Sequence, residues 1–319
     1  MLSRTADHLF WMARYMERAE NTARMLDVNY QTSLLPQSAD KAEQGWRGML
    51  GISELTGAYE LRHGAIDPRH VMDFMVRDET HPSSIAACLR AARENARAVR
   101  GTITTELWET TNQTWLEFNR MLRQVGFERD PSAFFEWVKF RSHLSRGVTV
   151  GTMLQDESLH FIRIGTFLER ADNTARLLDV KFHALNGDYF GREQNDDDAP
   201  EIDFYHWSAI LRSVSGFEIY RRVYRNVIVP EKVAELLILR PDMPRSLASC
   251  MNGVVDNLKL VSNALSADTE RRAGRLRSDL EFGRIDEILA TGIHAYLTHF
   301  LDRVNDIGAG ISRDFLVPE

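Results

Sequence analysis

A thirteen-residue segment occurs twice in this chain, and this duplication constrains the fold more than any other feature. The first copy, Met16–Val28, reads MERAENTARMLDV, and the second, Leu168–Val180, reads LERADNTARLLDV. Ten of the thirteen aligned positions are identical, and the other three exchange Met for Leu or Glu for Asp. Because chance does not produce such a match within one chain, the sequence predicts an internal duplication with an offset of 152 residues.

Each copy of the motif has the periodicity of an amphipathic α-helix. Its apolar positions recur at steps of three and four residues, which places them along one stripe of a helix. Ala19 and Ala23 lie at the centre of the first stripe, and Ala171 and Ala175 at the centre of the second. Because alanine is small, a neighbouring helix can approach each stripe closely. The opposite arc of the first copy is polar and carries Arg14, Glu17, Glu20, Asn21, Arg24 and Asp27.

The polar arc matches between the two copies as well as the apolar stripe does, so we interpret it as constrained. Three interpretations stay open: a buried ion-pair network, a site for a ligand or partner, or a solvated helix face. The candidate binding residues are Glu17, Arg18, Asn21, Arg24, Glu169, Arg170, Asn173 and Arg176. Two antiparallel helices related by a dyad would bring Glu17, Asn21 and Arg24 against their counterparts. Arginine forks in such a seam suit carboxylates, phosphates or an acidic protein surface.

A weaker repeat continues beyond the motif. Trp46 aligns with Trp207, and Tyr59 with Tyr220, at an offset of 161. At an offset of 162 the aligned pairs are Pro68 with Pro230, Pro82 with Pro244, Ser84 with Ser246 and Cys88 with Cys250. The pattern predicts two helical repeat units, residues 1–155 and 156–319, packed about an approximate two-fold axis as one composite domain.

Helical periodicity extends along the whole chain, and we find no convincing strand pattern with hairpin turns. The expected helices span about 3–32, 42–62, 69–76, 83–100, 106–124, 131–146, 156–186, 204–225, 231–239, 245–266, 269–282 and 284–311. Residues 188–203 are polar and acidic and are expected to form an exposed loop. The predicted fold class is all-α, an internally duplicated helical bundle with pseudo-two-fold symmetry.

Composition argues against several classes of protein. The formal net charge of −7 disfavours a nucleic-acid binder, which usually carries a basic patch. No apolar run approaches the roughly 20 residues that cross a bilayer, so we expect no membrane span, and the N-terminus lacks the apolar core of a signal peptide. Two cysteines do not make a disulfide framework, and a reducing, cytoplasmic location fits best.

The Glu-Arg motif within a long helix, present twice, resembles the Alpha-E family of bacterial all-helical proteins. Further stretches that match are Ala92–Arg97 with Trp108 and Asn112, Gly151–Met153, His160–Gly165, and Met243–Ser246. The resemblance covers essentially the whole chain. It implies an accessory component of gene clusters that also encode circularly permuted ATP-grasp ligases and transglutaminase-like peptidases, and it transfers no catalytic residues.

Other chemistry has weaker support from the residues. The motif copies supply four carboxylates, from Glu17, Glu20, Glu169 and Asp172. A ferritin-like di-iron site, however, needs Glu-x-x-His pairs, and the neighbouring arginines repel a metal cation. We therefore expect no metal and no cofactor. His8 and His160 share a helix face with aromatic residues and are expected to be core histidines. Cys88 and Cys250 follow Pro-x-Ser early in helices, where a thiol can be activated, yet their apolar neighbours favour a buried structural role.

These observations lead to two functional hypotheses. The first is an accessory subunit, binding or co-catalytic, of an ATP-grasp amide-ligase or peptide-modification system, which recognises a partner protein or a carboxylate-bearing peptide. The alternative is a stand-alone enzyme that acts on a peptide or amino-acid substrate through the duplicated Glu/Arg seam. A closed pocket with convergent polar groups would favour the enzyme, and an exposed flat patch would favour the accessory subunit.

Overall fold

The computed structural model describes residues 1–35, 38–124, 126–189 and 199–316, and this part of the chain is all-α. The first eight helices are α1 (Ser3–Ser33), α2 (Ala39–Ile52), α3 (Thr56–His63), α4 (Pro68–Arg77), α5 (Ile85–Ala98), α6 (Thr105–Arg123), α7 (Gly126–Arg129) and α8 (Pro131–Thr152). The next eight are α9 (Glu157–Tyr189), α10 (Ala199–Ser213), α11 (Phe217–Tyr224), α12 (Pro230–Ile238), α13 (Leu247–Leu260), α14 (Ala267–Glu281), α15 (Ile285–Thr291) and α16 (Ile293–Phe315). The all-α class predicted from periodicity is confirmed.

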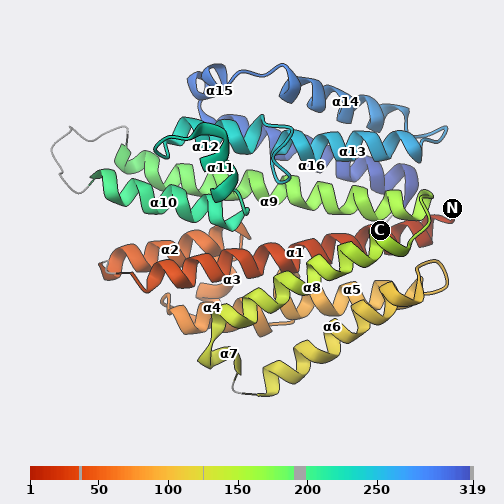
Figure 1. Ribbon diagram of the computed structural model, residues 1–319, viewed down its shortest axis with the longest axis horizontal. Coiled ribbons are helices and arrows are strands. Elements are labelled where there is room, and N and C mark those ends of the chain that lie inside the picture. Colours follow the sequence, from red (N-terminus) through yellow and green to blue (C-terminus); the bar gives the residue numbers. More distant parts are fainter. Residues whose placement is uncertain (36–37, 125, 190–198, 317–319) are drawn as a thin grey trace.

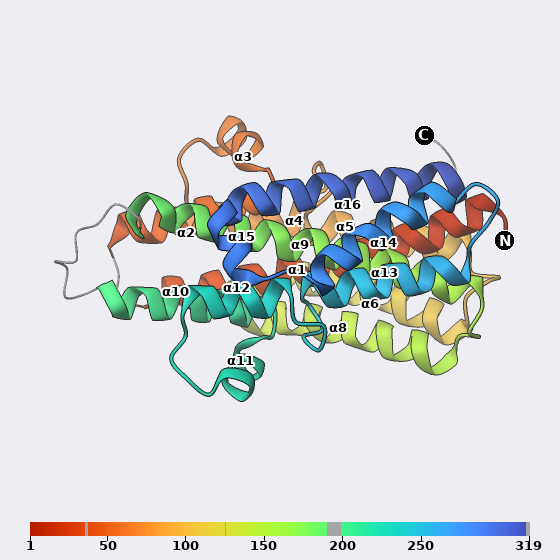
Figure 2. The same cartoon turned by 90° about the horizontal axis from the view of Figure 1, so that it is seen from above.

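Two long helices, α1 and α9, pack side by side through the centre of the molecule and carry the two motif copies (Figure 1). They run in the same direction, because Met1 contacts Glu157, Phe10 faces Gly165 and Glu17 binds Arg170. The expected antiparallel arrangement of the motif helices is therefore wrong. Helices α5 and α8 pack against α1, and α13 and α16 pack against α9. On the outside, α6 covers α5 and α8, while α14 covers α13 and α16, so that α6 and α14 lie at opposite edges of the molecule (Figure 1). The view from above shows that α16, α9 and α1 run along the length of the molecule (Figure 2). Helices α2 and α10 each contact both central helices. The motif helices are therefore surrounded by other helices.

Helix α1 is buried around its whole circumference in the motif. From Met16 to Asp27 every residue is buried except Arg18, which is partly exposed. A helix that is covered on all sides must bury its polar arc as well as its apolar stripe. The interpretation of this arc as a solvated face is therefore wrong, and its charged groups need partners inside the protein.

The two central helices approach each other closely at Gly165. A Cβ atom placed on this glycine would lie 2.4 Å from the carbonyl oxygen of Phe10 and 3.4 Å from the Cβ of Ala13. Carbon atoms in contact normally stay at least about 3.5 Å apart. Glycine is therefore required here by the distance between α1 and α9, not by its backbone conformation.

Residues aligned between the two halves begin equivalent helices. Pro68 and Pro230 are the first residues of α4 and α12, where the missing N–H of proline costs no hydrogen bond. Ser84 and Ser246 precede α5 and α13, and each hydroxyl accepts a backbone N–H of the first turn at 3.0 Å. Helix starts are thus specified locally by the sequence.

Three predicted helices are each divided in two. The predicted span 42–62 is broken between α2 and α3, 204–225 between α10 and α11, and 284–311 between α15 and α16. The breaks contain Glu54, Ser215 and Gly292, whose φ angles of 57°, 55° and 96° cannot continue a right-handed helix. Of the predicted acidic loop, residues 188–189 belong to α9 and 199–203 to α10, and residues 190–198 lie outside the described part.

The division into two repeat units at residue 155 stays a prediction. The proposed boundary falls between α8 and α9. The two motif copies make reciprocal contacts, described below, of the kind that a duplicated unit would make. None of the described helices combines the length and the apolar character needed to cross a bilayer.

Candidate functional site

The Glu-Arg pair of each motif copy binds the Glu-Arg pair of the other copy across the α1–α9 contact. Arg170 donates from Nε and Nη2 to the two carboxylate oxygens of Glu17, both at 3.0 Å. Arg18 donates from the same two atoms to Glu169, at 2.5 and 3.0 Å. Both contacts are bidentate guanidinium–carboxylate pairs, which combine charge with fixed geometry. We call Glu17, Arg18, Glu169 and Arg170 the reciprocal clamp.

Two arginines from outside the motif complete the Glu17 side of the reciprocal clamp. Arg245, which lies just before α13, donates from Nη1 to Glu17 at 2.7 Å and to Asn21 Oδ1 at 2.9 Å, and from Nη2 to Glu20 at 2.6 Å. Arg146 on α8 donates from Nη1 to Glu17 at 2.9 Å and to Glu20 at 2.6 Å. The two buried carboxylates therefore share two guanidinium groups, one from α8 and one from the segment before α13.

The electrostatic balance on this side favours ionised carboxylates. Burial by itself raises the pKa of Glu17, but Arg170 and Arg245 outweigh it and hold the pKa at about 2. Burial also opposes ionisation of Glu20, and Arg245 and Arg146 outweigh it, so its pKa lies well below the usual value. A carboxylate that stays ionised and hydrogen-bonded is a poor general acid or base near neutral pH. This side favours a structural ion-pair network over an acid–base site.

The corresponding side of α9 is less completely compensated. Glu169 also accepts a hydrogen bond from Arg14 Nε at 2.7 Å, and although burial raises its pKa, Arg14 and Arg18 lower it below the usual value. Asp172 accepts from Arg176 Nε at 2.9 Å. Burial is the largest influence on the pKa of Asp172 and raises it, because Arg176 only partly offsets the loss of solvent. The two sides therefore differ in how fully neighbouring arginines compensate their buried carboxylates.

The last arginine of each motif copy stays with its own helix. Arg24 Nε donates to Glu20, four residues earlier, at 2.8 Å, and Arg176 is paired with Asp172 at the same spacing. The expected contact of Arg24 and Arg176 with the opposite copy is therefore wrong, because an acid four residues earlier on the same helix is nearer. Asn21 likewise accepts from Arg245 and not from its counterpart in α9.

Each of these two arginines also binds a residue in the turn between two helices, and the two turns are equivalent in the repeat alignment. Arg24 Nη1 donates to Ser215 Oγ at 2.7 Å, and Arg176 donates to the carboxylate of Glu54. Ser215 and Glu54 are the left-handed residues that follow α10 and α2. A non-glycine residue in this region carries strain that surrounding contacts must support. The arginines supply such contacts from the central helices.

Ser83 and Arg245 occupy equivalent places in the two halves. The hydroxyl of Thr22 donates to the carbonyl of Ser83 at 3.2 Å, and the hydroxyl of Thr174 donates to the carbonyl of Arg245 at 2.9 Å. Each residue directly precedes the serine that caps α5 or α13. The backbones are thus anchored alike, but the guanidinium of Arg245 is replaced by a hydroxymethyl group on the other side.

A cavity of about 170 Å³ lies beside the α9 carboxylates. Its polar and charged lining comes from α1, α9 and two connecting segments and consists of Arg18, Asn21, Thr22, Ser53, Glu54, Ser83, Glu169, Asp172, Asn173 and Arg176. Asn21 is 3 % exposed and its Nδ2 has no hydrogen-bond partner among the described residues. The cavity therefore combines carboxylates with an unsatisfied amide donor.

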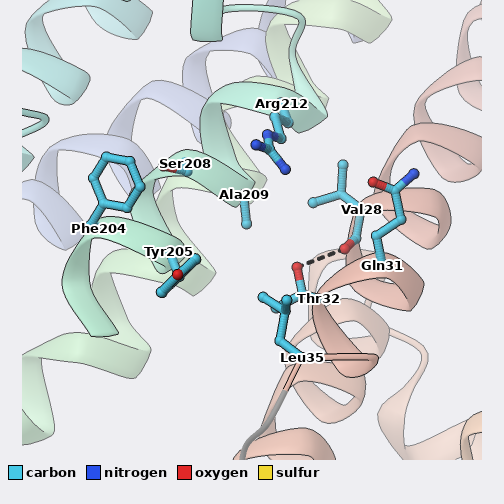
Figure 3. Close-up of a pocket in the computed structure, with 9 residues that line it drawn as sticks. All are labelled: Val28, Gln31, Thr32, Leu35, Phe204, Tyr205, Ser208, Ala209 and Arg212. Atoms are coloured by element: carbon cyan, nitrogen blue, oxygen red, sulfur yellow. Dashed lines mark hydrogen bonds between the residues drawn. The ribbon is translucent and has the colours of Figure 1, made fainter. Parts of the chain in front are cut away.

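A larger cavity of about 340 Å³ lies between the end of α1 and α10 (Figure 3). Most of its lining is apolar or uncharged, including Leu35, Phe204 and Tyr205, and Arg212 is its one charged residue. Thr32 Oγ1 in this lining donates to the carbonyl of Val28 at 2.8 Å. The smaller cavity therefore holds the convergent charged groups, and the larger one does not.

The motif-associated histidines are hydrogen-bonded to asparagines. His8 Nδ1 lies 2.8 Å from Asn95 Oδ1, and His160 Nδ1 lies 2.8 Å from Asn257 Oδ1. Both asparagines also donate to the carbonyl four residues earlier in their own helix. The expectation of satisfied histidines is confirmed for both, and the expected burial is confirmed for His160, whereas His8 is partly exposed.

The cysteines are buried free thiols. Cys88 and Cys250 are both 0 % exposed, and burial raises the pKa of each to about 12. The structural role expected for them is confirmed, because a protonated buried thiol is a poor nucleophile. Within the described residues no group of three or more His, Cys, Asp or Glu side chains is arranged to hold a metal ion.

Sequence reasoning missed the arginines outside the motif copies that serve the reciprocal clamp. Arg14 was assigned to the polar arc, but Arg146 and Arg245 were not connected with the motif at all. Two signals for Arg245 are present in the sequence: its place opposite Ser83 in the repeat alignment, and the stretch Met243–Ser246 that resembles the family. Of the predicted binding residues, Asn173 lines the smaller cavity, and its side chain makes no hydrogen bond to another described residue.

Comparison with known proteins places the chain in a family. A family model described as a predicted alpha-helical domain with a conserved ER motif matches residues 1–316. The uncharacterized proteins Mb2597 of Mycobacterium bovis and Rv2567 of Mycobacterium tuberculosis are each 26 % identical over 328 residues, which covers 93 % of this chain and 35 % of theirs. The chain thus spans about a third of the length of these relatives, and no solved structure matches it. Its two Glu-Arg pairs are the reciprocal clamp, and the chain belongs to the Alpha-E family.

Proposed function

We propose that this protein is a non-catalytic accessory subunit that binds an ATP-grasp amide ligase of a peptide-modification system. The surface that carries the proposal is the exposed side of α8 and the residue just beyond it. We call Phe140, Leu144, Val150 and Leu154 the α8 face; their exposed fractions lie between 46 and 76 %. Large apolar side chains that gather on an exposed surface are typical of sites that bind another protein, and these four lie within fifteen residues of one another on and just beyond one helix.

The α8 face differs from the corresponding surface of the other half. Helix α16 packs on α9 as α8 packs on α1, but its exposed side is polar and includes Thr298, His299, Asp302 and Asp306. A solvated helix normally carries such polar groups. The apolar composition of the α8 face is thus not a general property of outer helices in this fold, which supports a specific role in binding.

The internal pairing of the charged seam also supports a binding role. Glu17 and Glu20 are ionised, buried and shared among guanidiniums of the same chain, so they are not poised for proton transfer. The arginines of the reciprocal clamp are occupied in the same way and have little capacity left for a carboxylate-bearing peptide. Of the two recognition targets predicted from sequence, we therefore propose the partner protein.

In the mycobacterial relatives, the region similar to this chain makes up about a third of the polypeptide. We propose that the transglutaminase-like protein of the same gene cluster acts in the same system as the ligase. The proposal includes a cytoplasmic location, which is supported by the two unpaired thiols.

The test is binding of the purified chain to the ATP-grasp ligase encoded beside it. The double substitution Phe140→Glu and Leu144→Glu should weaken binding by at least about ten-fold, because truncation or charging of central apolar contacts removes most of the binding energy. Both side chains are exposed, so the helical circular dichroism should stay unchanged. The matched control is Thr298→Glu on the polar side of α16, which should bind like the wild type. Equal binding by the double variant, or no binding of the ligase by the wild type, would refute the proposal.

A further inference from the structure

The two sides of the reciprocal clamp differ in the additional arginines that serve them: Arg245 and Arg146 on the Glu17 side, and Arg14 on the Glu169 side. On the Glu17 side, Arg245 bridges Glu17, Glu20 and Asn21 Oδ1 within 2.9 Å. The counterparts of these three residues in α9 are Glu169, Asp172 and Asn173. The counterpart of Arg245 is Ser83, whose backbone is anchored in the same way. A cavity of about 170 Å³ lies where the α9 side lacks this arginine.

The charges around the cavity favour a cation. Glu169 is already paired with two guanidiniums, those of Arg14 and Arg18. Glu54 and Asp172, in contrast, share the single guanidinium of Arg176. A second positive group beside Asp172 would give this carboxylate the compensation that burial removes. An anion would instead compete with the carboxylates that the arginines already hold.

Two amide groups define the rest of the ligand. The side chain of Asn173 lines the cavity without a hydrogen bond to another described residue, so its Oδ1 can accept from a cation as Asn21 Oδ1 accepts from Arg245. Asn21 Nδ2 is buried against the cavity without a partner and needs an acceptor oxygen. A group that offers both a planar cation and a nearby carbonyl or carboxylate oxygen meets both requirements.

We propose that this cavity binds an arginine, free or within a peptide chain, whose guanidinium takes the place beside Asp172 and Asn173 that Arg245 takes beside Glu20 and Asn21. The cavity is smaller than the roughly 300 Å³ at which sites for drug-sized ligands begin, so it suits a single side chain. Its outer edge carries Glu54, which is 73 % exposed, so a ligand reaches it from solvent. This site is separate from the α8 face and does not depend on the proposed ligase partner.

The first experiment measures binding of small probes to the purified chain by calorimetry. Arginine should bind, and citrulline, which has the same backbone but a neutral urea group, should not bind measurably. Acetyl-arginine-methylamide reports on the source: tighter binding of this capped probe indicates a peptide, and tighter binding of free arginine indicates the amino acid. Absence of binding by both arginine probes, or equal binding of arginine and citrulline, would overturn the proposal.

The second experiment uses variants of the cavity. Ser83→Arg should place a guanidinium of the chain itself in the cavity, which should raise the melting temperature and abolish binding of arginine. Asp172→Asn should weaken binding about ten-fold or more, because a hydrogen-bonded charge partner is lost, and it tests the site even if Ser83→Arg does not fold. Ser278→Arg, at an exposed position on α14, adds the same charge elsewhere and should bind like the wild type. Undiminished binding by Asp172→Asn would show that the cavity is not the site.

Discussion

Arg245 is the residue whose loss should affect this fold most directly. Substitution by methionine keeps most of the unbranched apolar stem but removes the guanidinium with its donors to Glu17, Glu20 and Asn21. The side chain of Arg245 is 7 % exposed and those of the two glutamates at most 1 %. Water therefore cannot replace the lost hydrogen bonds without separating α1 from the segment that precedes α13.

The expected cost follows from what remains after the substitution. Removal of one member of a buried ion network typically destabilises a protein by about 3–5 kcal/mol. Because Glu17 keeps Arg170 and Arg146, and Glu20 keeps Arg24 and Arg146, we expect a loss near the lower end, about 3 kcal/mol. For a chain of this size, this corresponds to a melting temperature lower by on the order of 10 °C.

Thermal unfolding followed by circular dichroism measures this effect. Arg245→Lys should fall between the wild type and Arg245→Met, because an ammonium keeps the charge but cannot bridge three acceptors as a planar fork does. The matched control is Arg284→Met, which removes an exposed arginine paired with Asp286 and should leave the transition unchanged. If Arg245→Met melts within 1–2 °C of the wild type, roughly half a kcal/mol, the network does not stabilise the fold as argued.

Three further predictions concern acid stability, the thiols and the central packing. The pKa of Glu17 is held at about 2, below its value of about 4.3 in the unfolded chain. Its contribution to the free energy of unfolding is therefore complete above about pH 5 and is lost as the pH falls toward 2. The midpoint of urea unfolding should decrease over this window, and a midpoint that does not change with pH would contradict the lowered pKa. Cys88 and Cys250 should react with a thiol reagent only on unfolding, as measured by absorbance, and rapid reaction of the native protein would show that they are accessible. Gly165→Ala should destabilise the protein by about 1–3 kcal/mol through contact with Phe10, and an unchanged melting temperature would mean that the helices separate freely.

The sequence determined which segments are helical and where most of them begin. The three- and four-residue periodicity, the prolines at the first helical position and the capping serines act within a few residues, so they can be interpreted without a fold. The breaks at Glu54 and Ser215 were missed, because neither residue type signals a left-handed backbone. Those conformations are supported by contacts with Arg176 and Arg24, which are distant in the chain.

The duplicated motif also identified the helices that contain the candidate site, but not what faces them. A polar arc on an amphipathic helix looks the same whether water or protein covers it, so burial of Glu17 and Glu20 could not be predicted. Their partner Arg245 is more than 220 residues away in sequence, and only tertiary packing brings it to them.

The difference between the two sides of the reciprocal clamp was likewise decided by the tertiary structure. The alignment already set Ser83 opposite Arg245, yet a serine in place of an arginine has no meaning until the space that the arginine would fill is known. Local sequence encodes torsion angles and faces of helices, whereas charge compensation depends on which distant groups share a buried volume. The repeat therefore followed from the sequence, and the cavity beside Asp172 followed from the fold.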